Sequence, residues 1–448
     1  MLPGRARPLV FWLSLALLAP SAVWAQLPRA ERPEEVGLSS HRLERLTEAL
    51  EQYVAEGRLP GGVALVARKG KVAYLRPFGY RDLEAEDPMQ TDSIFRIASQ
   101  TKALVSVGVM ILQEEGKLVI NEPLAFYLPE FRETTVAVAK ADAEDESGDD
   151  DDSEGDGEDE PENEDEPGYE IVKANRPILI RDLLTHTAGI GYGNGPAQDR
   201  WAEAGIQGWY FADRDEPIGE TISRMAELPI DAQPGEDFVY GYSTDILGVL
   251  IERVSGLSLD QFLHQRILQP LGMDDTHFYL PESKRDRLSV VYSAAENGLE
   301  KAPDPGGMVG QGAYVDGPRK SFSGGAGLLS TADDYALFLQ MMLEGGALGQ
   351  HRILGRKTVE VMTVDHLKGK EISPGVGFGL GFSIVKDLGA RGVPGSVGEF
   401  GWGGAYHSSY WVDPEEELVV VYFTQLIPAG RIADHLKLRA LVYQAIVD

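Results

Sequence analysis

The chain has 448 residues, 43% of them hydrophobic and 25% charged, which is the composition of a globular protein with a sizeable buried core. Its formal net charge of −30 disfavours nucleic acids and anionic membrane surfaces as partners, because both would repel it. The absence of cysteine excludes disulfides, thiolate nucleophiles and cysteine-ligated metals.

The N-terminus has the pattern of a secretory signal peptide. Two arginines precede an apolar run over residues 9–18, and Val23 and Ala25 suit cleavage before Gln26. The run is shorter than the roughly 20 residues that a membrane span needs. We therefore expect residues 1–25 to be removed, leaving a bacterial periplasmic or secreted protein with no stable membrane anchor.

A helix and a β-hairpin are the first elements predicted after this segment. Four apolar residues share one face of the helix expected from Ser40: Leu43, Leu46, Leu50 and Val54. Two β-rich runs follow, 63–68 and 72–78, and a tight turn containing Gly70 joins them.

The middle of the chain is mostly helical by pattern, and long Gly/Pro-rich loops separate its helices. The helical patterns cover Ser99–Glu115, Ile178–Leu184, Thr221–Leu228, Thr244–Val254 and Ser258–Ile267. Near the C-terminus, a second pair of β-rich runs meets at Asp413-Pro414, and a final helix is expected around 435–447.

These elements predict an α+β fold in which an antiparallel sheet is flanked by helices and an inserted helical lobe faces it across a cleft. Residues 26–98 and 320–448 would form the α/β lobe from both ends of the chain. Residues 99–319 would form the helical lobe.

An acidic insertion interrupts the helical lobe at residues 141–168. Positions 142–166 alone hold 17 Asp or Glu residues and no Lys or Arg. They contain no aromatic or branched aliphatic side chain, so they cannot bury enough surface to offset their ordering entropy, and we expect disorder. We interpret the insertion as a solvated loop. Weak, multi-site binding of divalent cations such as Ca²⁺ remains the alternative, although no calcium-loop spacing is matched cleanly.

The motif with the clearest chemistry is Ser99-Gln100-Thr101-Lys102. Its spacing places Ser99 and Lys102 on the same face of a helix that starts at Ser99. A serine hydroxyl is a weak nucleophile unless a base assists it, and partial burial can lower the pKa of a lysine enough for that task. Lysine inside an otherwise apolar helix is unusual without a role. The sequence therefore predicts Ser99 as nucleophile and Lys102 as its base.

Two further motifs follow in order. One is PGEDFVYGY at 234–242, ahead of a helix, and the other is WGGA at 402–405, ahead of the final strands. Together with S-x-x-K they resemble the serine β-lactamase-like superfamily, which includes class C β-lactamases and penicillin-binding proteins, over roughly residues 35–445. The resemblance implies hydrolysis through an acyl-enzyme, with no cofactor and no metal.

The same resemblance assigns further roles. Tyr240 would relay protons with Lys102, and the backbone N–H groups of Ser99 and Ala405 would form the oxyanion hole. In isolation, a tyrosine between Phe238 and a helix is more often a packing residue.

The chain departs from the β-lactam-hydrolysing relatives at two positions. Those relatives usually have Tyr-x-Asn and a third motif that begins with Lys or His, whereas this chain has Tyr242 and Trp402. A Trp-Gly-Gly motif resembles the family VIII carboxylesterases. We therefore expect Trp402, Gly403, Gly404 and Tyr242 to bind or admit the substrate. Trp402 could equally be a wall of the core.

The histidines carry no clear catalytic or metal pattern. His186 is interpreted as structural, and His407 could face either the cleft or the surface. The eight histidines lack any metal-ligand spacing, and no G-x-S-x-G motif indicates an α/β-hydrolase.

The leading hypothesis is a serine hydrolase that cleaves small carboxylic esters, with a small-molecule ester or amide as its partner. Within the same class, a β-lactamase, a D-Ala-D-Ala or D-amino-acid peptidase and an acyl transferase remain open. From a different class, a non-catalytic protein that binds peptidoglycan fragments or cations remains open, although Ser99, Lys102 and Tyr240 argue against it.

Overall fold

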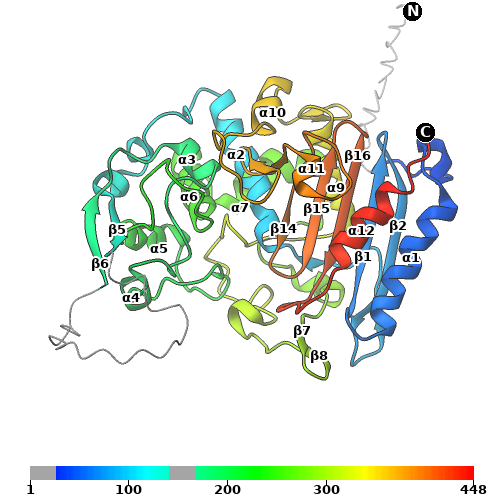
Figure 1. Cartoon of the computed structure of the whole chain (residues 1–448). Coiled ribbons are helices and arrows are strands. Elements are labelled where there is room, and N and C mark those ends of the chain that lie inside the picture. The colour runs from blue at the N-terminus through cyan, green and yellow to red at the C-terminus, as the bar shows by residue number, and fades with distance from the viewer. Residues whose placement is uncertain (1–26, 141–167) are drawn as a thin grey trace, which may run out of the picture.

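The computed structural model describes residues 27–140 and 168–448 of the chain (Figure 1). The expected signal peptide at 1–25 lies outside these ranges, and so does the acidic insertion except for Gly168. Among the residues described, no helix is both long enough and apolar enough to cross a lipid bilayer.

One eight-stranded sheet forms the centre of the fold, and all its neighbouring strands are antiparallel. In spatial order its strands are β12 (Val376–Phe378), β13 (Ser383–Val385), β14 (Phe400–Gly404), β15 (Ser408–Asp413), β16 (Leu418–Thr424), β1 (Gly61–Arg68), β2 (Lys71–Asp82) and β3 (Asp87–Pro88). β16 pairs with β1, so segments near the two ends of the chain meet inside the sheet. The predicted α+β fold class is confirmed, while the lobe boundaries at 98/99 and 319/320 stay a prediction.

Strands β1 and β16 are buried along their whole length. Their apolar sequences, GGVALVAR and LVVVYFT, suit strands that are covered on both faces, because side chains on either face then meet other apolar groups. The register pairs Val63 with Phe423 and Val66 with Val420.

Helices α1 (Ser40–Ala55) and α12 (Asp434–Tyr443) cover one face of this sheet (Figure 1). Three residues of the predicted apolar face of α1 are confirmed as buried: Leu43, Leu46 and Leu50. The fourth buried residue is Tyr53, and Val54 is only half-buried. Both positions lie about one turn after Leu50, so helical spacing alone does not separate them.

The other face is covered by α9 (Ala332–Leu343), which contacts β16, β1 and β15. The most buried helix of the middle region is α2 (Thr101–Glu114), whose residues 101–112 are all buried. It begins two residues later than the sequence predicts, because a 3₁₀ turn at Ala98–Gln100 precedes it.

The remaining α-helices lie mostly in the middle of the chain, and apart from the 13-residue helix Ser243–Ser255 they are short. They are α3 (Ile180–Leu184), α4 (Gln198–Glu203), α5 (Ile218–Met225), α6 (Ser243–Ser255), α7 (Leu259–Leu263), α8 (Gln269–Leu271), α10 (Arg356–Met362) and α11 (Leu388–Arg391). Four two-stranded pairs accompany them: β4 (Phe95–Arg96) with β9 (Leu329–Ser330), β5 (Thr135–Ala139) with β6 (Tyr169–Lys173), β7 (Tyr292–Ala295) with β8 (Gly298–Lys301), and β10 (Ala347–Leu348) with β11 (His351–Arg352).

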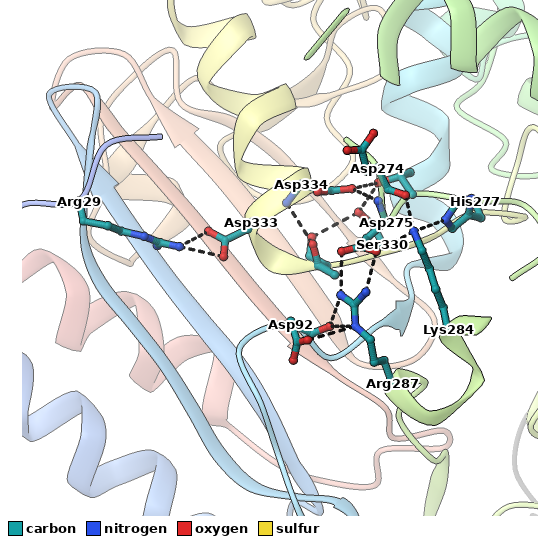
Figure 2. Close-up of polar contacts among 12 residues, drawn as sticks. Arg29, Asp92, Asp274, Asp275, His277, Lys284, Arg287, Ser330, Asp333 and Asp334 are labelled. Atoms are coloured by element: carbon teal, nitrogen blue, oxygen red, sulfur yellow. Dashed lines mark hydrogen bonds and ion pairs between the residues drawn. The ribbon is translucent and has the colours of Figure 1, made fainter. Parts of the chain in front are cut away.

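A polar network fastens the segment after α8 to the sheet side of the molecule (Figure 2). The Arg287 guanidinium donates to both oxygens of Asp275 at 2.7 Å and to the backbone carbonyl of Asp92 at 2.6 and 3.0 Å. Lys284 lies 2.8 Å from the same Asp275 carboxylate and 3.1 Å from His277 Nε2. Asp92 precedes β4, so the network connects the middle of the chain to the turn that leads into Ser99.

Asp334, in the first turn of α9, is the buried end of this network (Figure 2). Its Oδ2 accepts hydrogen bonds from the Asp275 N–H at 2.8 Å and from the Thr276 hydroxyl at 2.9 Å. Burial raises the pKa of the Asp334 carboxyl to about 7, although these two hydrogen bonds oppose the rise. Its neighbour Asp333 is exposed and forms an ion pair with Arg29 at 2.8 Å.

We expect Asp334→Asn to flatten the loss of stability between pH 5 and pH 9. A carboxyl whose pKa is raised by folding contributes stability that is present at low pH and is lost as the pH rises through the folded pKa. For a rise to about 7, the loss over this range amounts to about 3 kcal/mol. Denaturant melts at both pH values measure it, with Asp333→Asn as the control. Equal pH slopes in wild type and Asp334→Asn would contradict the assignment.

Candidate active site

Ser99 lies on a strained turn between β4 and α2. The residue before it, Ala98, has a left-handed φ of 43° although it is not glycine. This conformation is uncommon for a residue with a Cβ and persists only where the surroundings impose it. Ala98 is fully buried, whereas Ser99 is half-buried, so the turn presents the serine hydroxyl at the surface of the core.

The two residues between Ser99 and Lys102 hold this turn in place. The Gln100 side chain donates to Ser408 Oγ at 3.2 Å, and its backbone carbonyl accepts from the Tyr335 hydroxyl at 2.9 Å. The Thr101 hydroxyl oxygen accepts from the Leu328 N–H at 3.0 Å. The turn is therefore bonded to β15, to α9 and to the segment before β9.

Lys102 lies beneath Ser99, as the spacing predicts, and only 2% of its surface is exposed. Its ammonium nitrogen is 3.4 Å from Ser99 Oγ, 3.1 Å from Tyr192 Oη and 2.7 Å from the Gly325 carbonyl oxygen. An ammonium group has three N–H donors and no acceptor, so these three oxygens satisfy it completely.

The charge state of Lys102 differs from the sequence expectation. Burial by itself lowers the pKa of the ammonium, but interaction with the acidic groups Tyr192, Tyr240 and Asp245 outweighs burial, and the pKa lies above its ordinary value. Lys102 is therefore charged at neutral pH. This direction is opposite to the lowering expected from burial alone, because the fold places acidic groups around the lysine.

Tyr240 completes this group from the segment before α6. Its ring lies under the Lys102 ammonium, 4.7 Å from nitrogen to ring centroid. Its phenol oxygen accepts a hydrogen bond from Trp402 Nε1 at 2.9 Å, so strand β14 reaches directly to this tyrosine. The structure thus brings Ser99, Lys102, Tyr240 and Trp402 together.

His186 supports the Tyr240 ring from the side, as the structural interpretation expected. The two rings are 4.7 Å apart, and Phe378 packs on the histidine at 5.5 Å. Burial, and next the charge of Lys102, holds the pKa of His186 well below its ordinary value. The imidazole is neutral and fully buried, so it acts as a wall.

Tyr192 is the residue of this site that the sequence analysis did not single out. Its hydroxyl is the second acceptor of Lys102. It lies in the run GIGYGNG, in which Gly191 and Gly195 leave room for the Asp231 carboxylate, since a Cβ at either position would come within 2.2 Å of an Asp231 oxygen. An aromatic residue between glycines is the one signal in the sequence that points to it.

Tyr242 does not occupy the substrate-facing position that was expected. It is fully buried, its ring lies 5.1 Å from Tyr192 and stacks on Trp201 at 5.9 Å, and its hydroxyl donates to the Gly208 carbonyl at 2.6 Å. Its observed role is to support Tyr192. Where the β-lactam-hydrolysing relatives have Asn, this chain therefore lacks a polar side chain for the substrate, and the buried Tyr242 ring does not narrow the space beside Ser99.

The glycines of the third motif differ in their surroundings. A Cβ on Gly404 would lie 2.6 Å from the Ile97 carbonyl oxygen and 2.6 Å from Ser408 Oγ. A Cβ on Gly403 would meet only the Ser408 carbonyl, at 3.3 Å. Side chains alternate between the faces of a strand, so Gly404 shares the face of Trp402 and Gly403 points away. Gly404 thus allows β14 to approach the Ser99 turn, with Ala405 next in the chain.

His407 follows this motif and points to α12. Its Nε2 lies 2.8 and 2.9 Å from the oxygens of Asp434, and Tyr422 donates to the same carboxylate at 2.7 Å. The ring of His435 stacks on His407 at 4.2 Å, and the ligand atoms of His407, Asp434 and His435 lie within 4.8 Å of one another. In the structure described, His407 and Asp434 form a hydrogen-bonded pair on which His435 stacks. The expected absence of a metal site stays a prediction.

Residues 46–444 match the family model described as Beta-lactamase. The chain belongs to this family. Protein Rv1367c of Mycobacterium tuberculosis is 33% identical over 391 residues, which is 83% of this chain and 87% of that protein. Esterase EstB of Burkholderia gladioli is 31% identical over 406 residues, 86% of this chain and 91% of the esterase.

A solved structure, "EstCE1, a hydrolase with promiscuous acyltransferase activity", superposes with a TM-score of 0.73 and 27% identity over 90% of this chain and 99% of that one. The resemblance inferred from the three motifs is confirmed. This member of the Beta-lactamase family is a serine hydrolase.

We expect Gly404→Ala to lower kcat/KM for p-nitrophenyl acetate at least about tenfold, because the added methyl group displaces β14 from the Ser99 turn and small misplacements are costly in catalysis. Gly403→Ala is the matched variant, and its loss is expected to stay within about threefold because its Cβ has room. Thermal melts check that both proteins fold. Equal losses in the two variants would show that the close approach at Gly404 is unimportant.

Proposed function

We propose that the protein hydrolyses small carboxylic esters through an acyl-enzyme on Ser99. The observation that supports this best is the buried, fully hydrogen-bonded Lys102 beside Ser99 Oγ, with Tyr240 and Trp402 next to it. In the first half-reaction, Ser99 Oγ attacks the carbonyl carbon and the bond to the alcohol breaks. In the second, water attacks the acyl-enzyme and releases the acid.

In this proposal Tyr240 relays the Ser99 proton: its oxygen accepts that proton as its own phenol proton leaves. Lys102 already holds three protons and cannot accept another, whereas the Tyr240 oxygen receives a Trp402 N–H and lies near the ammonium charge. These two contacts fix the position of the Tyr240 oxygen. The proton then goes to the leaving alkoxide. The N–H groups of Ser99 and Ala405 bind the carbonyl oxygen as it becomes negative.

Esters are favoured over β-lactams and D-Ala-D-Ala peptides, because those substrates carry a carboxylate that must be bound. Trp402 offers one N–H and no charge, and that N–H is already donated to Tyr240. The Tyr242 hydroxyl is likewise used, on the Gly208 carbonyl. A neutral ester requires neither anchor.

A small apolar cluster beside the nucleophile supports short acyl groups. It contains Ala98, Ala326 and Tyr406, and Trp209 and Ala405 pack against it. An acyl chain bound to Ser99 would meet the partly exposed members of this cluster, Trp209 and Ala405, and the Trp209 ring would restrict its length. The N-terminal pattern at 1–25 supports export to the periplasm or medium as part of the same proposal.

Transfer of the acyl group to an alcohol other than water is the second candidate. The first half-reaction is the same, and only the acceptor that attacks the acyl-enzyme differs. The likeness to EstCE1, described as a hydrolase with promiscuous acyltransferase activity, supports testing alcohols in the ester assay.

Ser99→Ala is expected to abolish turnover and to leave the fold intact. The side chain that would carry the covalent intermediate is lost, and alanine fits the turn next to α2. The measurement is p-nitrophenyl acetate hydrolysis together with labelling by a fluorophosphonate probe, located by peptide mass spectrometry. Wild-type protein is the control for labelling. Undiminished hydrolysis in purified Ser99→Ala, or a label on another residue, would refute the assignment of the nucleophile.

The ester preference predicts that kcat/KM, relative to the uncatalysed rate, is higher for p-nitrophenyl acetate or butyrate than for a chromogenic cephalosporin. A charge-assisted hydrogen bond exceeds a neutral one by about 1 kcal/mol or more, so a missing cation costs roughly tenfold. Trp402→Lys tests the reason, since a restored cation should narrow the gap. A cephalosporin enhancement equal to that of the esters in wild-type protein would favour a β-lactamase or peptidase instead.

A further inference from the structure

Asp245 is a buried carboxylate beside the candidate active site, and it has no part in the reaction steps proposed above. It is the third residue of α6, five positions after Tyr240, and only 1% of its surface is exposed. A buried carboxylate without partners is strongly unfavourable, so its contacts indicate what keeps it there.

The segment 323–327 lies against Asp245 and supplies those contacts. The Ser323 hydroxyl donates to Asp245 Oδ1 at 2.6 Å, and the Gly325 N–H donates to the same oxygen at 3.0 Å. The approach requires glycine, because a Cβ on Gly325 would lie 2.3 Å from Asp245 Oδ2. Gly324 is equally restricted, since its Cβ would lie 2.4 Å from the Thr244 carbonyl oxygen.

A continuous chain of hydrogen bonds leads from this carboxylate to the lysine. Ser323 donates its hydroxyl proton to Asp245 and accepts the Ala326 N–H on its oxygen at 3.1 Å. The same peptide unit carries the Gly325 carbonyl, which accepts from the Lys102 ammonium at 2.7 Å, the shortest of its three contacts. Each bond in such a chain polarises the next, so negative charge on Asp245 makes the Gly325 carbonyl a better acceptor.

The electrostatic interaction between Asp245 and Lys102 supports the same role for Asp245 as the hydrogen bonds do. Burial raises the pKa of the Asp245 carboxyl, and the charge of Lys102 and the two donors on Oδ1 oppose that rise. Lys102 is faced by Tyr192 and the neutral His186 from the loop after α3, by Tyr240 from the segment before α6, and by Asp245 from α6 itself. Of these groups, Asp245 is the one whose ordinary form at neutral pH is negative.

We propose that Asp245 is a positioning residue for ester hydrolysis, whose charge and hydrogen-bond chain through Ser323 keep the Lys102 ammonium protonated and directed at Ser99. The inference rests on the proposed function. It adds a group that touches no substrate and acts through Lys102, and it explains why the segment at 323–327 carries glycines against the start of α6.

Asp245→Asn tests the charge. Asparagine is nearly isosteric, and its amide oxygen can still accept from Ser323 and Gly325, so the geometry is preserved while the negative charge is lost. Without that charge Lys102 loses its proton at lower pH. We expect the alkaline limb of kcat/KM for p-nitrophenyl acetate to move to lower pH by about one unit or more, with at least about a tenfold loss at neutral pH.

Asp334→Asn is the matched control, because Asp334 is also a buried carboxylate at the third position of its helix and lies outside the site. Its alkaline limb should coincide with that of the wild type. Ser323→Ala tests the hydrogen-bond chain with the charge retained, and it should lower kcat about tenfold without moving the limb.

An unmoved alkaline limb in Asp245→Asn, or the same movement in Asp334→Asn, would overturn the proposal. If Asp245→Asn does not fold, Ser323→Ala decides, and an unchanged kcat in that variant would overturn it as well. Wild-type protein is labelled with the fluorophosphonate probe in parallel. Failure of that labelling would refute the esterase itself, which separates the two outcomes.

Discussion

A buried ammonium group needs an acceptor for each of its three N–H bonds, and this requirement determines how the candidate active site is assembled. The acceptors of Lys102 come from three distant parts of the chain: the Ser99 turn, the loop at Tyr192 and the segment at Gly325. Each part is held by contacts of its own, through Gln100 and Thr101, around Asp231, and against α6. If any acceptor moved away, a buried N–H of Lys102 would be left unpaired. The ammonium group therefore holds the three segments of the site together.

Strand β14 adds a second constraint that concerns the substrate. Trp402 donates its single N–H to the Tyr240 oxygen, so the third motif connects Tyr240 to the sheet. It has no free side-chain donor at this position for a ligand. The same position therefore links two properties. Any side chain that binds a substrate carboxylate there would also remove the hydrogen bond that orients Tyr240.

Local patterns in the sequence were enough to predict the S-x-x-K pair, the faces of α1, the strands at both ends of the chain and their union in one antiparallel sheet. Contacts between distant segments were not predictable. Tyr192 has only the weak signal of an aromatic residue between glycines and Asp245 has none, and the significance of both depends on lying within reach of a lysine about 90 and 140 residues earlier in the chain. The pKa of Lys102 depends on the same kind of distant contact, because Tyr192, Tyr240 and Asp245 surround it only in the folded chain. The motif position of Tyr242 predicts a pocket residue, but a motif does not determine the direction of a side chain, and the ring of Tyr242 is buried.

The pairing of β1 with β16 has a consequence for the folding of the chain during synthesis. During synthesis, β1 lacks one of its two neighbours until residues 418–424 have left the ribosome, and its apolar sequence has an open edge for most of that time. Contacts between such distant segments close slowly. The protein therefore depends on protection of this edge while the chain is incomplete, and a chain truncated before β16 would expose an apolar, unpaired strand that favours association with other chains.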